Sequence, residues 1–331
     1  MSKIRKVYYF DKKSTQEMIS FLNNSANDKY VNSILFNPFL IFHHYLPLKL
    51  KFLPESFVLK DKKEIKGLIT VAPVKSMQNK MEIQKLLFEE NAFEDASQLV
   101  QYVVSKYKAM GALSIVVKVD DYLPELLAMF IKKCGFSQIS YEKLWRVNKF
   151  DNAEYDKHEF RLFRNSDAQA VAALYNDALL PHFRPLLGTE ETEYKDSLFA
   201  GLSYYSEYKY VIEDKNTENI TGFISIRTTD NENFIIDIVQ AGGIEFDIDS
   251  VLSFISDTIK KRRKRFGLYI RTKRYTNKGE EYENAFMQKG FECVQNQIVL
   301  TNSSAKVLRE PSPVKRFTVL NGFCPSGEIP I

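Results

Sequence analysis

The sequence has little of what marks a membrane protein, a secreted disulfide protein or a metal centre. Its 331 residues include three cysteines, Cys134, Cys293 and Cys324, which are far apart and follow no metal-ligand spacing. No uninterrupted apolar run reaches the about 18 residues of a membrane-spanning helix, and the start, MSKIRKVYYF, lacks the apolar stretch of a signal peptide. We therefore expect reduced thiols, no metal site, no transmembrane segment and a cytoplasmic protein.

Glycine and proline are also scarce, at 13 and 11 residues, so no long segment has the composition of a disordered chain. The length indicates about two domains, and 44% hydrophobic residues are enough for packed cores. The net charge of +4 is unevenly distributed. Residues 1–150 carry 23 basic and 15 acidic side chains, whereas residues 151–331 carry 23 and 27, which gives +8 and −4. The two halves therefore differ in surface.

The chain contains an internal repeat. The motifs KKCGF and MQKGF contain Gly135 and Gly290, which are 155 positions apart, and IKGLITV and ITGFISI contain Gly67 and Gly222 at the same spacing. Solenoid repeats are only about 20 to 50 residues long, so this period indicates a duplicated domain. We assign residues 1–150 to an N-terminal domain, 151–302 to a C-terminal domain and 303–331 to an extended arm.

Both halves predict the same order of elements. A strand and helices precede three strands that form an antiparallel meander, and then come a helix, a strand, a helix that ends in Gly-Phe, and a last strand. Apolar residues such as Val251, Phe254, Ile255 and Ile259 share one helical face. The predicted fold class is α/β (α+β mixed), with a mixed, mostly antiparallel sheet and helices on both faces in each half.

This order, with Gly135-Phe136 and Gly290-Phe291 closing the last helix of each half, resembles the GNAT acyltransferase superfamily over residues 7–300. The resemblance implies a tandem GNAT protein, an arrangement in which often only one half binds acyl-CoA. It also implies acyl transfer to an amine on a small molecule or protein. The family holds the CoA pyrophosphate on the backbone N–H groups of a Gln/Arg-x-x-Gly-x-Gly/Ala loop at a helix N-terminus.

The two halves differ at this loop. In the first half, residues 89–95 (EENAFED) contain four acids and no glycine. A carboxylate about 5 Å from a phosphate costs about 3 kcal/mol, more than the up to about 2 kcal/mol that a helix terminus provides. We therefore expect no CoA binding by the first half in the family's manner.

The second half retains part of the loop, so the resemblance implies an acetyl-CoA or acyl-CoA site there. Its candidate cofactor-binding residues are Val239, Gln240, Ala241, Gly242 and Gly243. Glu245 stands where a small residue belongs, and Asp249 is predicted to cap the next helix with its own carboxylate. The alternative is a flexible Gly-Gly turn in a degenerate site.

Catalytic candidates are few. Where the family often has a tyrosine as general acid, this chain has Ile131 and Phe286, and Tyr282 is the candidate substitute, or alternatively a packing residue. Asp237 lies in the apolar strand FIIDIVQ, where burial would raise its pKa and suit it to act as general base; the alternative is a structural aspartate paired with Arg or Lys. His182 and Arg184 follow the first helix of the second half, where the resemblance implies the acceptor pocket, so they are candidate substrate contacts.

The run KKRRKR contains six consecutive cations and predicts a polyanion partner, or alternatively a solvated helix C-terminus. Its residues are Lys260, Lys261, Arg262, Arg263, Lys264 and Arg265. The predicted function is an acyl-CoA-dependent N-acyltransferase with the C-terminal half as catalytic unit. The alternatives are a non-catalytic GNAT-like binding or scaffold protein and a Fem-like aminoacyl transferase.

Overall fold

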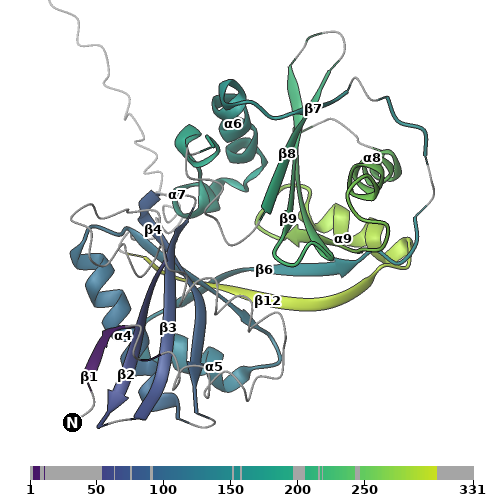
Figure 1. Cartoon of the computed structure of the whole chain (residues 1–331). Coiled ribbons are helices and arrows are strands. Elements are labelled where there is room, and N and C mark those ends of the chain that lie inside the picture. The colour runs from purple at the N-terminus through teal and green to yellow at the C-terminus, as the bar shows by residue number, and fades with distance from the viewer. Residues whose placement is uncertain are drawn as a thin grey trace, which may run out of the picture.

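Figure 1 shows the computed structural model of the chain. It describes residues 3–7, 11, 54–62, 64–74, 77–89, 92–150, 153–156, 159–196, 206–214, 217, 219–242 and 247–303. The helices predicted between the first strand and the meander of the first half, and most of the C-terminal arm, lie outside these residues. The domain boundaries therefore remain predictions.

The described strands form one 12-stranded sheet in the order β1-β2-β3-β4-β5-β12-β6-β11-β10-β9-β8-β7. In the first half they are β1 Lys3–Lys6, β2 Glu55–Asp61, β3 Glu64–Val74, β4 Met77–Phe88, β5 Ser114–Asp120 and β6 Ser137–Arg146. In the second half they are β7 Phe160–Leu162, β8 Ser206–Glu213, β9 Ile220–Thr228, β10 Asn233–Gln240, β11 Gly267–Lys273 and β12 Glu292–Ser303. Only the β4–β5 and β10–β11 pairs are parallel, which confirms the mixed, mostly antiparallel sheet.

The helices follow the predicted order. They are α4 Phe93–Ala109, α5 Pro124–Ala128 with the π-helix Met129–Lys133, α6 Ala168–Ala178, α7 Arg184–Leu187, α8 Ile248–Lys260 and α9 Gly279–Gln288. The apolar face predicted for α8 is confirmed, because its four named residues are buried. In the second half, α8 packs in the core on one face of the sheet and α6 in a separate core with Phe223 and Val239. No helix among the described residues is long and apolar enough to cross a membrane.

The repeated glycines end equivalent helices. Gly135 and Gly290 have φ angles of 69° and 74°, in the left-handed region that favours glycine. Each stands directly after the C-cap residue of a helix and directly before a buried phenylalanine, Phe136 or Phe291. The repeat in the sequence is therefore a repeat in backbone geometry.

The two halves exchange their last strands. β12, from the end of the second half, pairs with β5 of the first half, and β6, from the end of the first half, pairs with β11 of the second. β6 and β12 also pair with each other and run side by side between the two halves (Figure 1). The sequence predicts a separate sheet for each half and does not indicate this exchange.

The exchange extends to the hydrophobic cores. Leu300 on β12 is fully buried in the core of the first half, with Ile115 and Val117 of β5. Trp145 on β6 is buried in the core of the second half, where its ring lies edge-on to Phe286 at 6.0 Å. Each half therefore buries a large apolar side chain that the other half supplies.

The variant Leu300→Ala tests this coupling. Deleting a fully buried leucine side chain typically lowers the free energy of unfolding by about 2 to 5 kcal/mol. We expect a loss of this size here, because Leu300 belongs to the second half of the chain but packs in the core of the first half. Denaturant unfolding measures the loss. Leu162→Ala, at a site that is 62% exposed, is the control and should change stability little. Equal stability of both variants would contradict the shared core.

Candidate functional site

The second half contains a gap between two parallel strands. β10 and β11 pair from Asn233 opposite Gly267 as far as Asp237 opposite Arg271, and the ladder ends there. β10 nevertheless continues to Gln240 and β11 to Lys273. The last residues of the two strands therefore face each other without a ladder between them, and side chains fill the space.

A small cavity lies at this divergence. The centre of a water molecule can move within about 20 Å³ of it, so the cavity is large enough for one water. The lining residues are Tyr175, Ala178, Ile238, Val239, Gln240, Arg271, Thr272, Lys273, Thr276, Asn277, Lys278 and Tyr282. They come from α6, β10, β11, the segment after β11, and α9, so five parts of the second half meet here.

Tyr282 and Gln240 meet across the cavity. The Tyr282 hydroxyl donates a hydrogen bond of 2.5 Å to Oε1 of Gln240, whose side chain is buried. Burial, with a smaller effect of Glu281, raises the pKa of Tyr282 above its usual value, so the phenol stays protonated. Its ring also stacks on Phe286, with ring centroids 5.9 Å apart. The packing of its ring fits the alternative, and the role of Tyr282 as general acid stays a prediction.

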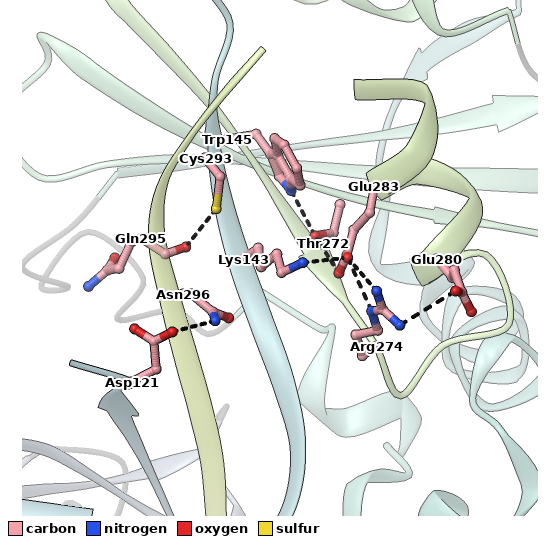
Figure 2. A network of polar contacts seen from close by, with 10 residues as sticks. All are labelled: Asp121, Lys143, Trp145, Thr272, Arg274, Glu280, Glu283, Cys293, Gln295 and Asn296. Atoms are coloured by element: carbon pink, nitrogen blue, oxygen red, sulfur yellow. Dashed lines mark hydrogen bonds and ion pairs between the residues drawn. The ribbon is translucent and has the colours of Figure 1, made fainter. Parts of the chain in front are cut away.

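A buried carboxylate fixes the helix that carries Tyr282. Glu283 is fully buried, and its Oε2 accepts hydrogen bonds from Lys143 Nζ at 2.8 Å and from Arg274 Nη2 at 2.9 Å. Trp145 Nε1 donates to Thr272 Oγ1 at 3.0 Å in the same network, which Figure 2 shows. Since Lys143 and Trp145 belong to β6, the first half holds α9 in place beside the cavity.

Glu283 is not among the site residues predicted from the sequence. The available signal was its position three residues before Phe286, which places an acid on the buried face of the helix. Glu142 of β6, which is 2% exposed, is not among the predicted residues either. Glu142 accepts a hydrogen bond of 2.6 Å from the Tyr275 hydroxyl and pairs with Lys118 at 2.9 Å.

The expected rise in the pKa of Asp237 is wrong. Asp237 is 4% exposed and forms ion pairs with Arg227 and, at 2.9 Å, with Lys273. Burial alone would raise its pKa, but Lys273, Arg271 and Arg227 outweigh burial and hold the pKa well below its usual value. A carboxylate with so low a pKa is a weak base near neutral pH, which favours the structural alternative.

The N-terminus of α8 differs from the prediction. Its cap is Asp247, not Asp249, and the Asp247 side chain accepts hydrogen bonds from the Asp249 N–H at 3.1 Å and the Ser250 hydroxyl at 2.7 Å. Asp249 lies in the first turn and pairs with Lys289 at 2.5 Å. Asp247 therefore uses one of the N–H groups that would meet a phosphate, and both carboxylates oppose an anion there.

The first half repeats this ion pair. Glu94 in the first turn of α4 pairs with Lys133 at 2.6 Å, just as Asp249 of α8 pairs with Lys289. Glu94 and Asp249 are again 155 positions apart, and each lysine stands one or two residues before the helix-ending glycine. In both halves a carboxylate therefore occupies the helix terminus at which the family binds an anion.

The other predicted site residues are dispersed. Val239 and Gln240 line the cavity, Ala241 and Gly242 follow them, and Gly243 lies outside the described residues. His182 and Arg184 are exposed and do not line the cavity. Among the described residues, no three His, Cys, Asp or Glu side chains gather as metal ligands would.

Comparisons with known structures find similar folds. A tandem GNAT protein from the clavulanic acid biosynthesis pathway, solved without AcCoA, has a TM-score of 0.60 at 11% identity over 92% of this chain and 99% of that one. A GCN5-related N-acetyltransferase from Sphaerobacter thermophilus has a TM-score of 0.58 at 9% identity, over 91% and 95%. A putative acetyltransferase from Pyrococcus horikoshii also has a TM-score of 0.58, at 11% identity over 92% and 90%. No family model and no curated protein matches the sequence.

The buried carboxylate Glu142 predicts a pH-dependent stability. Burial would raise its pKa, but Lys118, Arg271 and Lys273 together with the Tyr275 hydroxyl lower it to about 2 from the ordinary 4.5. Because the folded pKa is below the unfolded one, the ionised group stabilises the fold above pH 4.5, and this contribution, roughly 3 kcal/mol, is lost as the pH falls toward 2.

The variant Glu142→Gln should therefore be less stable than the wild type at pH 7, and the difference should shrink between pH 4.5 and 2. Urea unfolding at several pH values measures it. Glu125→Gln, at an exposed site on α5, is the control. A difference that stays constant with pH would mean that Glu142 is not held ionised.

The carboxylates at the N-terminus of α8 predict a gain of binding. The variant Asp247→Asn/Asp249→Asn keeps a capping oxygen but removes two negative charges, so its affinity for CoA, measured by calorimetry, should exceed that of the wild type about tenfold or more. The control Glu125→Gln/Asp177→Asn removes two exposed charges elsewhere. If both variants bind CoA as the wild type does, these carboxylates are not what opposes the phosphate.

Proposed function

Because the chain has the tandem GNAT fold, we propose that it is an N-acyltransferase whose reaction site is the cavity between β10 and β11. The observation that carries this proposal is the end of the β10–β11 ladder at Asp237 and Arg271, which leaves strand edges on both sides of a cavity that Tyr282 and Gln240 line. The acceptor would be an amine on a small molecule or protein.

The residues present fit only part of an acyl-CoA. The ends of β10 and β11 present side-chain donors to a narrow thioester arm, but the cavity between them holds about one water, so its lining side chains would have to move apart to admit the arm. The α8 N-terminus is not suited to the pyrophosphate, since Asp247 caps it and Asp249 lies in its first turn. We therefore expect acyl-CoA to bind weakly, and we assign no step of the reaction to its phosphates.

The chain's own groups supply one proton and a fixed geometry. The Tyr282 hydroxyl stands at the cavity, so Oη would donate a proton to the leaving thiolate after exchanging its hydrogen bond to Gln240. Because burial raises its pKa, Oη is a weaker acid than an exposed phenol, and opening of the site to the acyl donor would have to lower that pKa. The described residues that line the cavity include no carboxylate and no histidine, so the amine proton would leave through water. Asp237 would keep Lys273 and Arg271 neutralised beside the cavity.

A second candidate function has its own support. The self-capped helix terminus of α8 and the repeated ion pair of α4 favour a GNAT-like binding or scaffold protein that no longer binds CoA. The two candidates differ in one property, since only the enzyme turns over acyl donor.

The variant Tyr282→Phe separates them. If Tyr282 protonates the thiolate, turnover of acetyl-CoA with a panel of amines should fall about 100-fold or more while the thermal stability changes little. Release of free CoA thiol measures turnover, and Tyr269→Phe, whose ring lies outside the cavity lining, is the matched control. No turnover by the wild type with any acyl-CoA, at concentrations up to millimolar, would favour the binding protein.

A further inference from the structure

The basic run at residues 260–265 has no part in the proposed reaction. It begins at the last residue of α8 and continues through the turn that leads to β11, and all six side chains are exposed. Because α8 has 13 residues, the run lies about 20 Å from the N-terminus of that helix, and none of its residues lines the cavity. It is therefore a separate surface.

Most of these cations are not neutralised. Lys260 pairs with Asp257 at 3.6 Å, and Arg263 donates to the Asn231 carbonyl at 3.1 Å. Within the described part of the chain, Lys261, Lys264 and Arg265 form no ion pair. The negative end of the α8 dipole accounts for cations in the last turn only, because the effect falls off within one turn. It does not account for Lys264 and Arg265.

The surroundings leave the positive charge in excess. The β9–β10 hairpin brings Asp230 and Glu232 near the run, since the Gly267 N–H donates to the Glu232 carbonyl at 2.8 Å. The Asp230 carboxylate is used within the hairpin itself, where it accepts from the Asn233 N–H at 2.7 Å. Lys149, just after β6, is exposed as well.

The aromatic rings beside the run are half-buried and in contact with other side chains. The Arg262 guanidinium lies 4.0 Å from the centre of the Tyr208 ring, and Phe266 packs edge-on against Phe234 at 6.1 Å. Unpaired bases bind proteins largely by stacking on bare aromatic rings, which the described residues do not offer here. The run also has no exposed apolar side chain that would enter a lipid bilayer.

We propose that Lys261, Arg262, Lys264 and Arg265, here called the basic surface, bind the phosphate backbone of a nucleic-acid duplex. Such contacts position a protein on a duplex without reading its sequence. Arginine and lysine at the end of one helix meet successive phosphates, and their binding releases condensed counterions. The proposal does not depend on the acyltransferase activity.

The test is fluorescence anisotropy with a labelled 20-base-pair DNA duplex, the matching RNA duplex, the single strands, and vesicles containing phosphatidylserine. Four phosphate contacts give a slope of log K against log salt of about −3.6, so affinity for a duplex should fall about 100-fold between 50 and 200 mM NaCl. The ratio of the two duplex affinities identifies DNA or RNA as the partner.

The variant Lys261→Gln/Lys264→Gln/Arg265→Gln should make the slope shallower by about 2.7, because three contacts are lost. The control Lys62→Gln/Lys108→Gln/Lys132→Gln removes the same charge from the first half and should leave the slope unchanged. Equal losses in both variants, a flat salt response, or tighter binding to single strands or vesicles than to either duplex would overturn the proposal. Circular dichroism verifies that both variants stay folded.

Discussion

The pairing of β6 with β12 is the interaction on which the rest of the structure depends. It joins two copies of one fold into a single sheet, and it places Trp145 and Leu300 each in the core of the opposite half. It also brings Lys143 to Glu283 and Lys118 to the same cluster as Arg271. The cavity between β10 and β11 is therefore supported from a half that contributes none of its lining residues.

Charged side chains on the strands near the β6–β12 pair explain how acidic residues can be buried there. Asp237 and Glu142 are costly to bury, yet each is matched by cations from neighbouring strands, so both stay ionised. Removing one partner would leave a buried charge unpaired, which costs more than the pair contributes. The cluster thus restricts which strands can lie beside one another and supports the register of the sheet.

Much of the fold could be predicted because its signals are local. The glycines at 135 and 290 mark helix ends through their own backbone angles, and the apolar face of α8 follows from spacing alone. The strand exchange could not, because β6 and β12 have similar patterns and nothing local selects the partner. The shift in the pKa of Asp237 is opposite in direction to the prediction, because it depends on which strands are neighbours. The cations that lower the pKa, Arg227, Arg271 and Lys273, come from other strands.

The strand exchange also affects how a duplicated protein can change during evolution. When two copies each complete their own sheet, the copy without a task can be lost by deletion. Here neither copy has a complete core without the other, so loss of either copy would expose apolar side chains of the one that remains. Each half is therefore kept by the packing that it supplies to the other.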